Sequence, residues 1–261
     1  MQAESSGVMR PLTNSYKNKE IGKFTVCCGG TLVIPAGWCG SLIAWFLILV
    51  PSFLQIIFIN SAFEAAVPID CAYICTLALS LTFLFMTTFT DPGIIPRVNP
   101  DIERQELRSM FEATDENVEV DHIAIVKNEE IVCMKCRTCN IYKPPRSFHC
   151  SDCQACIEVH DHHCPWVGTC VGKRNHRWFL CFGIFTMIHA LFTFIVDILY
   201  LVKFVDFSDK ADNDPLKVVC MVLLVFTSTI VCCVGGLSCY HSRLACLGAT
   251  TNEELRGKYG K

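Results

Sequence analysis

Four long apolar runs constrain this chain more than any other feature. They are 22 to 25 residues long and cover residues 38–59, 67–89, 178–202 and 216–240. The hydrocarbon core of a bilayer is about 30 Å thick, and a helix of about 20 apolar residues crosses it. A helix of a water-soluble protein rarely stays apolar on every face over that length. The runs therefore predict an α-helical integral membrane protein with four transmembrane helices.

The distribution of lysine and arginine predicts how these helices are oriented. Basic residues are found in residues 1–37, in the long segment 91–177 and in residues 241–261, whereas residues 60–66 hold none. The connection 203–215 holds two lysines against four aspartates. Short loops rich in lysine and arginine stay on the cytosolic side of a membrane. We therefore expect the N-terminal segment, the long middle segment and the C-terminal tail to be cytosolic.

The long middle segment divides into two parts of different composition. Residues 91–131 are acidic and poor in aromatics, and we expect a linker with a helical turn or two near residues 103–112. Residues 132–177 are dense in cysteine and histidine. Disulfides rarely persist in the reducing cytosol. Cys-x2-Cys pairs with nearby histidines are instead typical of zinc sites. The second part is therefore predicted to be a cysteine-rich zinc domain.

The number of candidate ligands in this domain fits two zinc ions. With Cys164 set aside there are eight, which is enough for two tetrahedral sites: Cys136, Cys139, His149, Cys150, Cys153, Cys156, His163 and Cys170. Spacing alone does not assign them to one site or the other. Cys133, three residues before Cys136, is either a further ligand or a spare thiol. Two structural zinc ions would stabilise a segment that has little apolar core of its own.

The remaining thiol, Cys164, follows an aspartate and a histidine. An ordinary cysteine has a pKa of about 8.5 and is mostly protonated at neutral pH. A neighbouring His162 could act as a base or as a cation that stabilises the thiolate, and Asp161 could orient that histidine. The pattern favours an enzyme that uses a covalent cysteine intermediate. Two alternatives stay open: Cys164 is itself a zinc ligand, or the chain is a membrane-anchored zinc module that binds partners without catalysis.

Several motifs resemble one enzyme family. The stretch Asp161-His162-His163-Cys164-Pro165-Trp166-Val167, in a cysteine-rich domain between the second and third of four spans, resembles the DHHC-type protein S-acyltransferases (palmitoyltransferases). Asp91-Pro92-Gly93 is similar to the DPG motif of that family, and Thr250-Thr251-Asn252-Glu253 to its TTxE motif. Residues 28–32 and 250–259 resemble the subgroup that includes the yeast Ras palmitoyltransferase. Thr169 stands where the family usually has asparagine, and members usually continue beyond the position of Lys261 with a further helix.

The resemblance implies a protein S-palmitoyltransferase. Cys164 would take a long-chain acyl group from palmitoyl-CoA as a thioester and pass it to cysteines of membrane-associated proteins. His162 would be the base, oriented by Asp161, and the acyl chain would lie among the four helices near Trp166. The first zinc would be held by Cys136, Cys139, His149 and Cys156. The second zinc would be held by Cys150, Cys153, His163 and Cys170.

The anionic phosphates of CoA require cations. The candidates are Lys143, Arg146, Lys173, Arg174 and Arg177, and the alternative is that these side chains face solvent or lipid headgroups. The net charge of −3 and the pI near 6.2 do not favour a nucleic-acid partner.

Location, partners and isolated residues are less constrained. We expect an endomembrane protein, with the Golgi favoured over the endoplasmic reticulum or plasma membrane, and the subgroup resemblance suggests an accessory subunit. The juxtamembrane Cys27 and Cys28 are either acylated or plain thiols. The ionisable His189 and Asp197 of the third span are expected to face the interior of the helix bundle or its exterior mouth, and His160 is expected at the surface.

Overall fold

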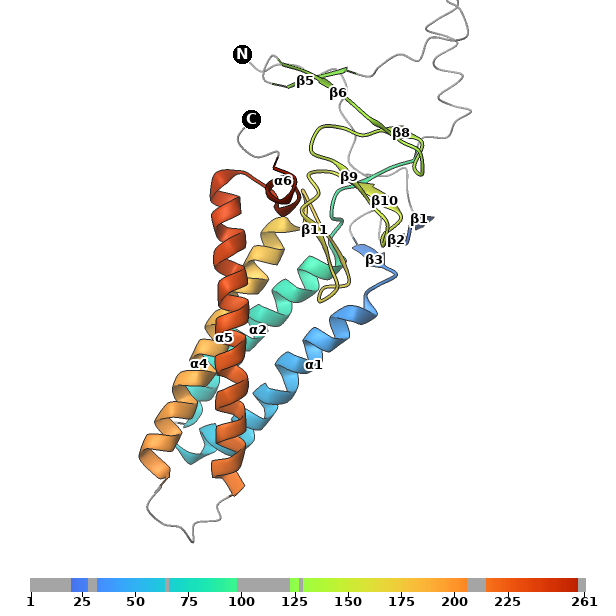
Figure 1. Ribbon diagram of the computed structural model, residues 1–261. Coiled ribbons are helices and arrows are strands. Elements are labelled where there is room, and N and C mark those ends of the chain that lie inside the picture. Colours follow the sequence, from blue (N-terminus) through green and yellow to red (C-terminus); the bar gives the residue numbers. More distant parts are fainter. Residues whose placement is uncertain are drawn as a thin grey trace, which may run out of the picture.

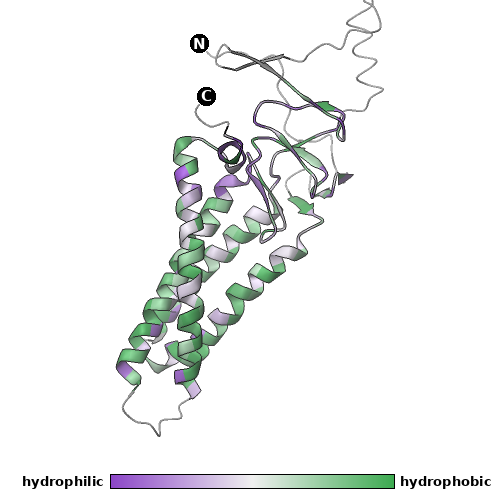
Figure 2. Cartoon of the chain, in the orientation of Figure 1, coloured by the Kyte–Doolittle hydropathy of each residue, from purple (hydrophilic) through white to green (hydrophobic). Residues whose placement is uncertain are grey.

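The computed structural model describes residues 20–27, 32–63, 66–97, 123–126, 129–205 and 215–257. In this part of the chain four helices are long and apolar enough to cross a membrane: Cys39–Ala62, Val67–Phe89, His176–Phe204 and Pro215–Leu247. They lie side by side as a bundle (Figure 1), and their residues are largely hydrophobic (Figure 2). A cysteine-rich region lies between the second and third helices. The predicted fold class is therefore confirmed.

Some of the helices extend beyond the apolar runs that predicted them. Helix α1 (Cys39–Leu54) continues as a π-helix (Gln55–Ile59) and a 3₁₀ turn (Asn60–Ala62), and α2 covers Ala66–Phe89. Helix α4 begins at His176 and ends at Phe204, and α5 covers Pro215–Leu247. With 33 residues, α5 is about 50 Å long. Its apolar run ends at residue 240 because polar side chains follow, but the helix continues and reaches the cysteine-rich domain.

His189 and Asp197 are both buried in the interior of the bundle. His189 Nε2 lies 2.9 Å from Ser52 Oγ, and its Nδ1 lies 2.9 Å from Thr76 Oγ1. These two bonds join α4 to α1 and α2. The Asp197 side chain is fully buried. Intramembrane polar groups that pair within a bundle in this way fix the relative positions of its helices.

Short antiparallel strands build the cysteine-rich domain at one end of the bundle (Figure 1). Strand β7 (Lys135–Cys136) pairs with β8 (Ile141–Tyr142), and β11 (His162–Cys164) pairs with β12 (Thr169–Val171). Strand β10 (Ala155–Ile157) pairs with both β9 (Phe148–Cys150) and β4 (Ile94–Ile95).

Residues 91–131, which we expected to form a linker, contain strands. Strand β4 belongs to the domain because Ile94 and Ile95 are almost fully buried. Residues 91–131 also contain β5 (Ile123–Val126) and all but the last residue of β6 (Glu129–Val132), which pair with each other. The helical turns expected near residues 103–112 lie outside the described residues.

A three-stranded sheet before the first helix supports the domain from another side. It consists of β1 (Glu20–Ile21), β2 (Phe24–Cys27) and β3 (Leu32–Pro35), in that order. Phe24, Val26 and Val33 are buried in one cluster with cysteines of the cysteine-rich domain. The Lys23 N–H donates to the Cys153 carbonyl at 2.9 Å. The sheet therefore forms part of the hydrophobic core beneath the second cysteine cluster.

Candidate active site and metal clusters

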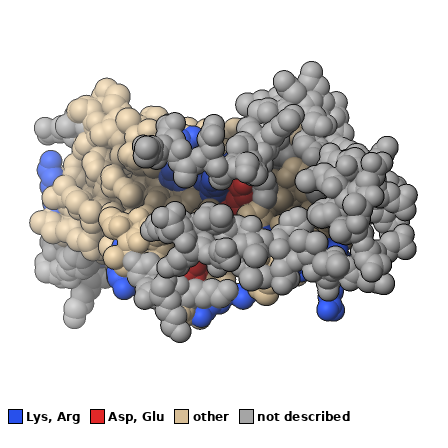
Figure 3. Space-filling view, turned by 90° about the horizontal axis from the view of Figure 1, so that it is seen from above, with Lys and Arg blue, Asp and Glu red and all other residues tan. Residues whose placement is uncertain are grey.

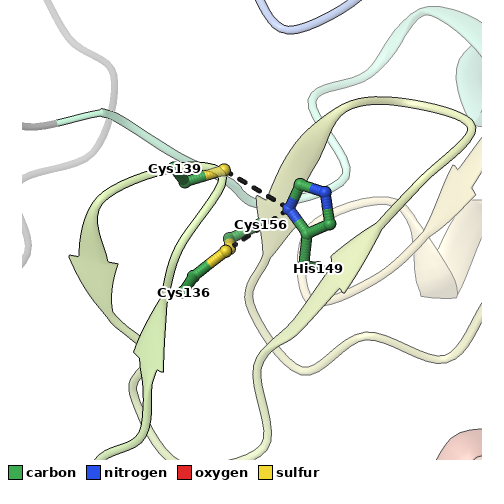
Figure 4. Close-up of side chains that lie close together, drawn as sticks. All are labelled: Cys136, Cys139, His149 and Cys156. Atoms are coloured by element: carbon green, nitrogen blue, oxygen red, sulfur yellow. Dashed lines mark hydrogen bonds between the residues drawn. The ribbon is translucent and has the colours of Figure 1, made fainter.

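The first cluster consists of Cys136, Cys139, His149 and Cys156 (Figure 4). Their four potential ligand atoms lie within 4.8 Å of one another. His149 Nδ1 is 3.3 Å from Cys139 Sγ and 3.7 Å from Cys156 Sγ. In a tetrahedral zinc site with ordinary bond lengths, nitrogen and sulfur ligands are about 3.6 Å apart. The donor set and its spacing therefore fit zinc.

The second cluster consists of Cys150, Cys153, His163 and Cys170. Its histidine Nδ1 lies 3.8, 3.4 and 3.7 Å from the sulfur atoms of Cys150, Cys153 and Cys170. Both groups are the ones that the family resemblance implies, and Cys164 and Cys133 belong to neither. The chain therefore has two Cys/His clusters that could bind metal.

The turns of the domain explain why Cys-x2-Cys spacing forms such clusters. In the pairs Cys136–Cys139 and Cys150–Cys153, the residue after the second cysteine has a positive φ. The angle is 53° at Asn140 and 52° at Gln154. This conformation reverses the chain directly behind the pair, so that both sulfur atoms face the same point. The Cys153 N–H also points at Cys150 Sγ, at 3.5 Å.

The register of β11 and β12 connects the second cluster to Cys164. His163 lies opposite Cys170, so the two strands each place one ligand on the same face of the hairpin. Successive side chains of a strand point to opposite faces. His162 and Cys164 therefore lie on the other face, toward the helices. Cys164 is 7% exposed and packs with Ala44, Leu84 and Phe179 of three different helices.

Asp161 and His162 form a close pair beside this thiol. His162 Nδ1 lies 2.5 Å from Asp161 Oδ2. Burial raises the pKa of Asp161, but hydrogen bonds from His162 and Thr251 outweigh it and hold that pKa at about 2. Burial lowers the pKa of His162, but its bonds to Asp161 and Cys164 outweigh that and raise it to about 9. His162 is therefore a cation at neutral pH, adjacent to Cys164.

The TTxE-like motif provides further donors to Asp161. Thr251 donates from its N–H to Asp161 Oδ1 at 2.8 Å and from its hydroxyl to Oδ2 at 2.9 Å. The motif forms the short helix α6 (Thr251–Leu255), which Thr250 and Glu253 close with a capping box. The Thr251 N–H at the start of the helix and the Asp161 carboxylate suit each other electrostatically. Sequence alone did not indicate that this motif contacts Asp161.

An apolar cavity of about 310 Å³ lies among the helices, and Cys164 is part of its wall. Trp166 and Phe179 line it near the cysteine-rich domain, and Ser52 and His189 line it within the bundle. Trp166 is 56% exposed, as an aromatic residue at a membrane interface can be. The cavity wall therefore includes residues of both the cysteine-rich domain and the membrane-capable helices.

The five predicted cations do not form one cluster. Arg146 donates to both carboxylate oxygens of Glu253, at 2.5 and 2.8 Å. Lys173 lies 3.2 Å from Glu158, and Arg174 pairs with Asp91 of the DPG-like motif. Arg177 packs over the Trp178 ring at 4.4 Å. Figure 3 views the molecule from above, and it likewise shows Lys and Arg atoms beside Asp and Glu atoms in the middle of that face.

A second, smaller groove of about 180 Å³ holds two of these cations, Lys143 and Arg146, together with Arg256. The Arg256 guanidinium lies over the Phe148 ring at 4.3 Å. Asn252 of α6 also lines the groove and lies next to Thr251, which binds Asp161. Arg256 was not among the predicted residues because its proximity to Lys143 depends on how α6 packs.

Three other residues differ from expectation or were not singled out. His160, expected at the surface, is buried because it packs between Phe148 and Cys170 and contacts Asn252. His241 of α5 stacks on His162, with ring centres 5.2 Å apart.

Asn175 was not singled out either. Its side chain donates to the Thr87 and Cys170 carbonyls at 3.1 and 2.9 Å, and so joins α2 to β12 at the start of α4.

Fold and site together define a class: an integral membrane protein with four membrane-capable helices and a metal-binding cysteine-rich domain against their end. Residues 132–258 match the model of the family described as DHHC palmitoyltransferase. The chain belongs to the DHHC palmitoyltransferase family.

The chain is similar to palmitoyltransferases of animals and to a probable protein S-acyltransferase of a plant. Palmitoyltransferase ZDHHC9 of Homo sapiens is 34% identical, and the match covers 97% of this chain and 71% of that protein. ZDHHC9 of Danio rerio is 32% identical over 97% of this chain and 67% of its own length. Probable protein S-acyltransferase 3 of Arabidopsis thaliana is 31% identical over 92% and 61%.

The family and its relatives settle the class of activity. The chain is a multi-pass membrane enzyme, a protein S-palmitoyltransferase, as the motifs predicted. A zinc module without catalysis, the alternative that the sequence left open, is thereby excluded.

Proposed function

We propose that Cys164 carries the acyl group between the donor and the protein substrate. Its sulfur attacks the thioester carbonyl of a long-chain acyl-CoA, the bond to the CoA sulfur breaks, and CoA takes a proton from the His162 imidazolium. The thiol of a substrate cysteine then attacks the Cys164 thioester, gives its proton to His162 and releases Cys164. The observation that carries this proposal is that Cys164 lines an apolar cavity and lies beside the Asp161–His162 pair.

Asp161 acts through His162. Its carboxylate keeps the imidazole oriented and favours the protonated form, in which the histidine stabilises the thiolate. Thr251 holds the carboxylate in place. The zinc ions that we assign to the two clusters take no part in the reaction. When bound, they would hold the strands of the domain together. The second ion would fix the orientation of β11, from which His162 and Cys164 project.

The acyl chain of palmitoyl-CoA is assigned to the cavity, with Trp166 beside its first carbons. The cavity walls are almost entirely apolar, which suits a hydrocarbon chain. Its wall includes Pro51 and Ser52 of α1 and His189 of α4. Burial of the chain also brings the reacting carbonyl to the thiol, because Cys164 is part of the cavity wall.

We assign the CoA phosphates to the groove around Lys143 and Arg146, to which Arg256 adds a third cation. Arg146 is bound to Glu253, and Arg256 lies on an aromatic ring, so both guanidinium groups are held in place. We give Lys173, Arg174 and Arg177 a supporting role, because they do not line this groove.

The membrane orientation follows from the basic loops. The cysteine-rich domain and both termini are placed on the cytosolic side, where CoA is available. The substrates are membrane-associated proteins with a cysteine close to the bilayer. Residence in the Golgi and an accessory subunit are part of the same proposal and rest on the subgroup resemblance alone.

The test is acylation of the purified full-length protein with labelled palmitoyl-CoA. Wild type and three variants are compared: Cys164→Ser, His162→Ala and, as a matched control, Cys233→Ser, which removes a thiol from the same cavity wall. We expect label that hydroxylamine releases from wild type and Cys233→Ser, and none from Cys164→Ser. His162→Ala should react at least about 100-fold more slowly.

Metal content is measured on the same samples. About two zinc ions per chain in every variant would show that loss of label is chemical and does not reflect unfolding. Label that persists in Cys164→Ser would overturn the assignment of the nucleophile, and label lost in Cys233→Ser would move it to that residue.

A further inference from the structure

A third group of potential metal ligands lies outside the two cysteine clusters. It consists of Asp161, His176 at the start of α4, and His241 of α5, and their potential ligand atoms all lie within 4.8 Å of one another. His241 Nδ1 is 3.8 Å from Asp161 Oδ2, and His176 Nε2 is 4.0 Å from Asp161 Oδ1. Two histidines from different helices therefore face one carboxylate.

The two histidine nitrogens have no hydrogen-bond partner among the residues that the structure describes. Both His176 Nε2 and His241 Nδ1 are buried and unpaired within the described part of the chain. The gaps of 3.8 and 4.0 Å to Asp161 are too long for direct hydrogen bonds. Buried polar atoms are normally satisfied, so a pair of orphaned nitrogens aimed at the same carboxylate calls for a bridging species.

The gaps suit a metal ion. Oxygen and nitrogen ligands at about 2.0–2.1 Å from zinc are about 3.3 Å apart in a tetrahedral site, so each pair would close by roughly half an ångström. Two imidazoles and one carboxylate, with water as the fourth ligand, are a donor set that zinc sites with an open position use. The side chain of His176 is 24% exposed, which gives an ion access to the otherwise buried group.

We propose that Asp161, His176 and His241 form a third metal site, which takes Zn²⁺ or a divalent transition metal of similar ligand preference and inhibits acylation when filled. The inhibitory part rests on the role proposed above for Asp161. A cation bound to this carboxylate competes with His162, whose Nδ1 lies 2.5 Å from Asp161 Oδ2, and weakens the contact that orients His162 beside Cys164. The ion at this site is exchangeable, in contrast to the two enclosed in Cys/His clusters.

The metal site is tested without the reaction. Full-length protein with the Cys164→Ser change, which removes the free thiol nearby, is dialysed against buffers of increasing free Zn²⁺, and bound zinc is counted by mass spectrometry. We expect about two ions per chain at low free Zn²⁺ and about three at high free Zn²⁺. His176→Gln and His241→Gln should each abolish the third ion and keep the first two.

A matched control is His189→Gln, which removes a buried histidine of the same bundle that is bound to Ser52 and Thr76. This variant should still bind the third ion. Absence of a third ion from the starting protein, or its retention in both His176→Gln and His241→Gln, would overturn the site.

Inhibition is tested in protein that keeps Cys164. We expect free Zn²⁺ to slow acyl-enzyme formation several-fold. A chelator too weak to remove structural zinc should restore the rate. In His176→Gln, added Zn²⁺ should leave the rate equal to the rate of the same variant without added metal. If a third ion binds but the rate is unchanged, the site stands and its inhibitory role is overturned. Failure of the proposed nucleophile would be visible separately, as label that does not depend on Cys164.

Discussion

At the residue scale, the proposed active site depends on one carboxylate with several partners. Asp161 accepts hydrogen bonds from His162 and from two groups of Thr251, and it is almost fully buried. The result is a pKa of about 2 for Asp161 and about 9 for His162. A group whose pKa is raised by folding stabilises the protein below its unfolded pKa and loses that contribution as the pH rises through the folded value.

Asp161→Asn should therefore change both catalysis and the pH dependence of stability. Without the charge the pKa of His162 falls toward 6.5, so most of the imidazole is neutral at neutral pH. We expect acyl-enzyme formation to fall by about 100-fold or more. In wild type the unfolding midpoint should drop as the pH rises through about 9, and this drop should be smaller in the variant. Glu20→Gln, which removes an exposed carboxylate from β1, is the control that should change neither quantity.

A second prediction at this scale concerns Thr169, which lies opposite Cys164 in the β11–β12 pair. Its hydroxyl oxygen is buried and lacks a partner within the described residues. A buried polar group without a partner costs about 1–3 kcal/mol. Thr169→Val keeps the shape and should raise the free energy of unfolding by about 1 kcal/mol, measured as a higher thermal midpoint in detergent.

The control for Thr169→Val is the same substitution at Thr186, whose hydroxyl is 2.6 Å from Ser80 Oγ. That variant loses a bond and should unfold at a lower temperature. A lower midpoint for Thr169→Val would contradict our account of this residue.

At the scale of elements, the β11–β12 hairpin joins a metal cluster on one face to the thiol on the other. Cys170→Ser should leave about one zinc ion per chain and strongly reduce acyl-enzyme formation, although Asp161, His162 and Cys164 are intact. The reason is that metal binding and local folding are coupled in domains of this size. Zinc content and label are measured together.

Cys133→Ser is the control, because this neighbouring thiol belongs to neither cluster. It should keep about two zinc ions and full label. Cys170→Ser protein with one zinc ion and wild-type label would show that the second cluster does not position β11.

The elements also show how far the sequence could predict this molecule. Transmembrane helices and Cys/His groups are visible in the sequence because hydrophobic length and ligand spacing are local properties. The N-terminal sheet and the contact of α6 with Asp161 are not visible, because they depend on packing between segments about 90 to 130 residues apart, such as Thr251 on Asp161 and Lys23 on Cys153. The same holds for Arg256, which joins Lys143 only in the folded chain.

At the scale of the whole molecule, the cavity is shared by the helices, and we expect its end within the bundle, away from Cys164, to set the room available to the acyl chain that we propose it binds. Ser52 of α1 lines it and is bound to His189 of α4. Ser52→Phe should fill this end, so that the preference shifts from palmitoyl-CoA to shorter acyl-CoA donors. The measurement is competition between donors of different chain length for the acyl-enzyme.

Ser52→Ala provides the control, since it removes the bond to His189 without filling space. It should retain the wild-type order of donors. An unchanged order in Ser52→Phe would show that the chain does not extend as far as this residue.

The bonds from α6 to Asp161 bear on when during its synthesis the protein becomes active. A growing chain is made from its N-terminus, so the segment with Asp161 and Cys164 leaves the ribosome before α4 and α5. At that stage the thiol lacks two of the helices that line its cavity, and Asp161 lacks the donors of Thr251. We therefore expect an incomplete chain not to react with acyl-CoA until its fourth helix has been inserted and α6 contacts Asp161.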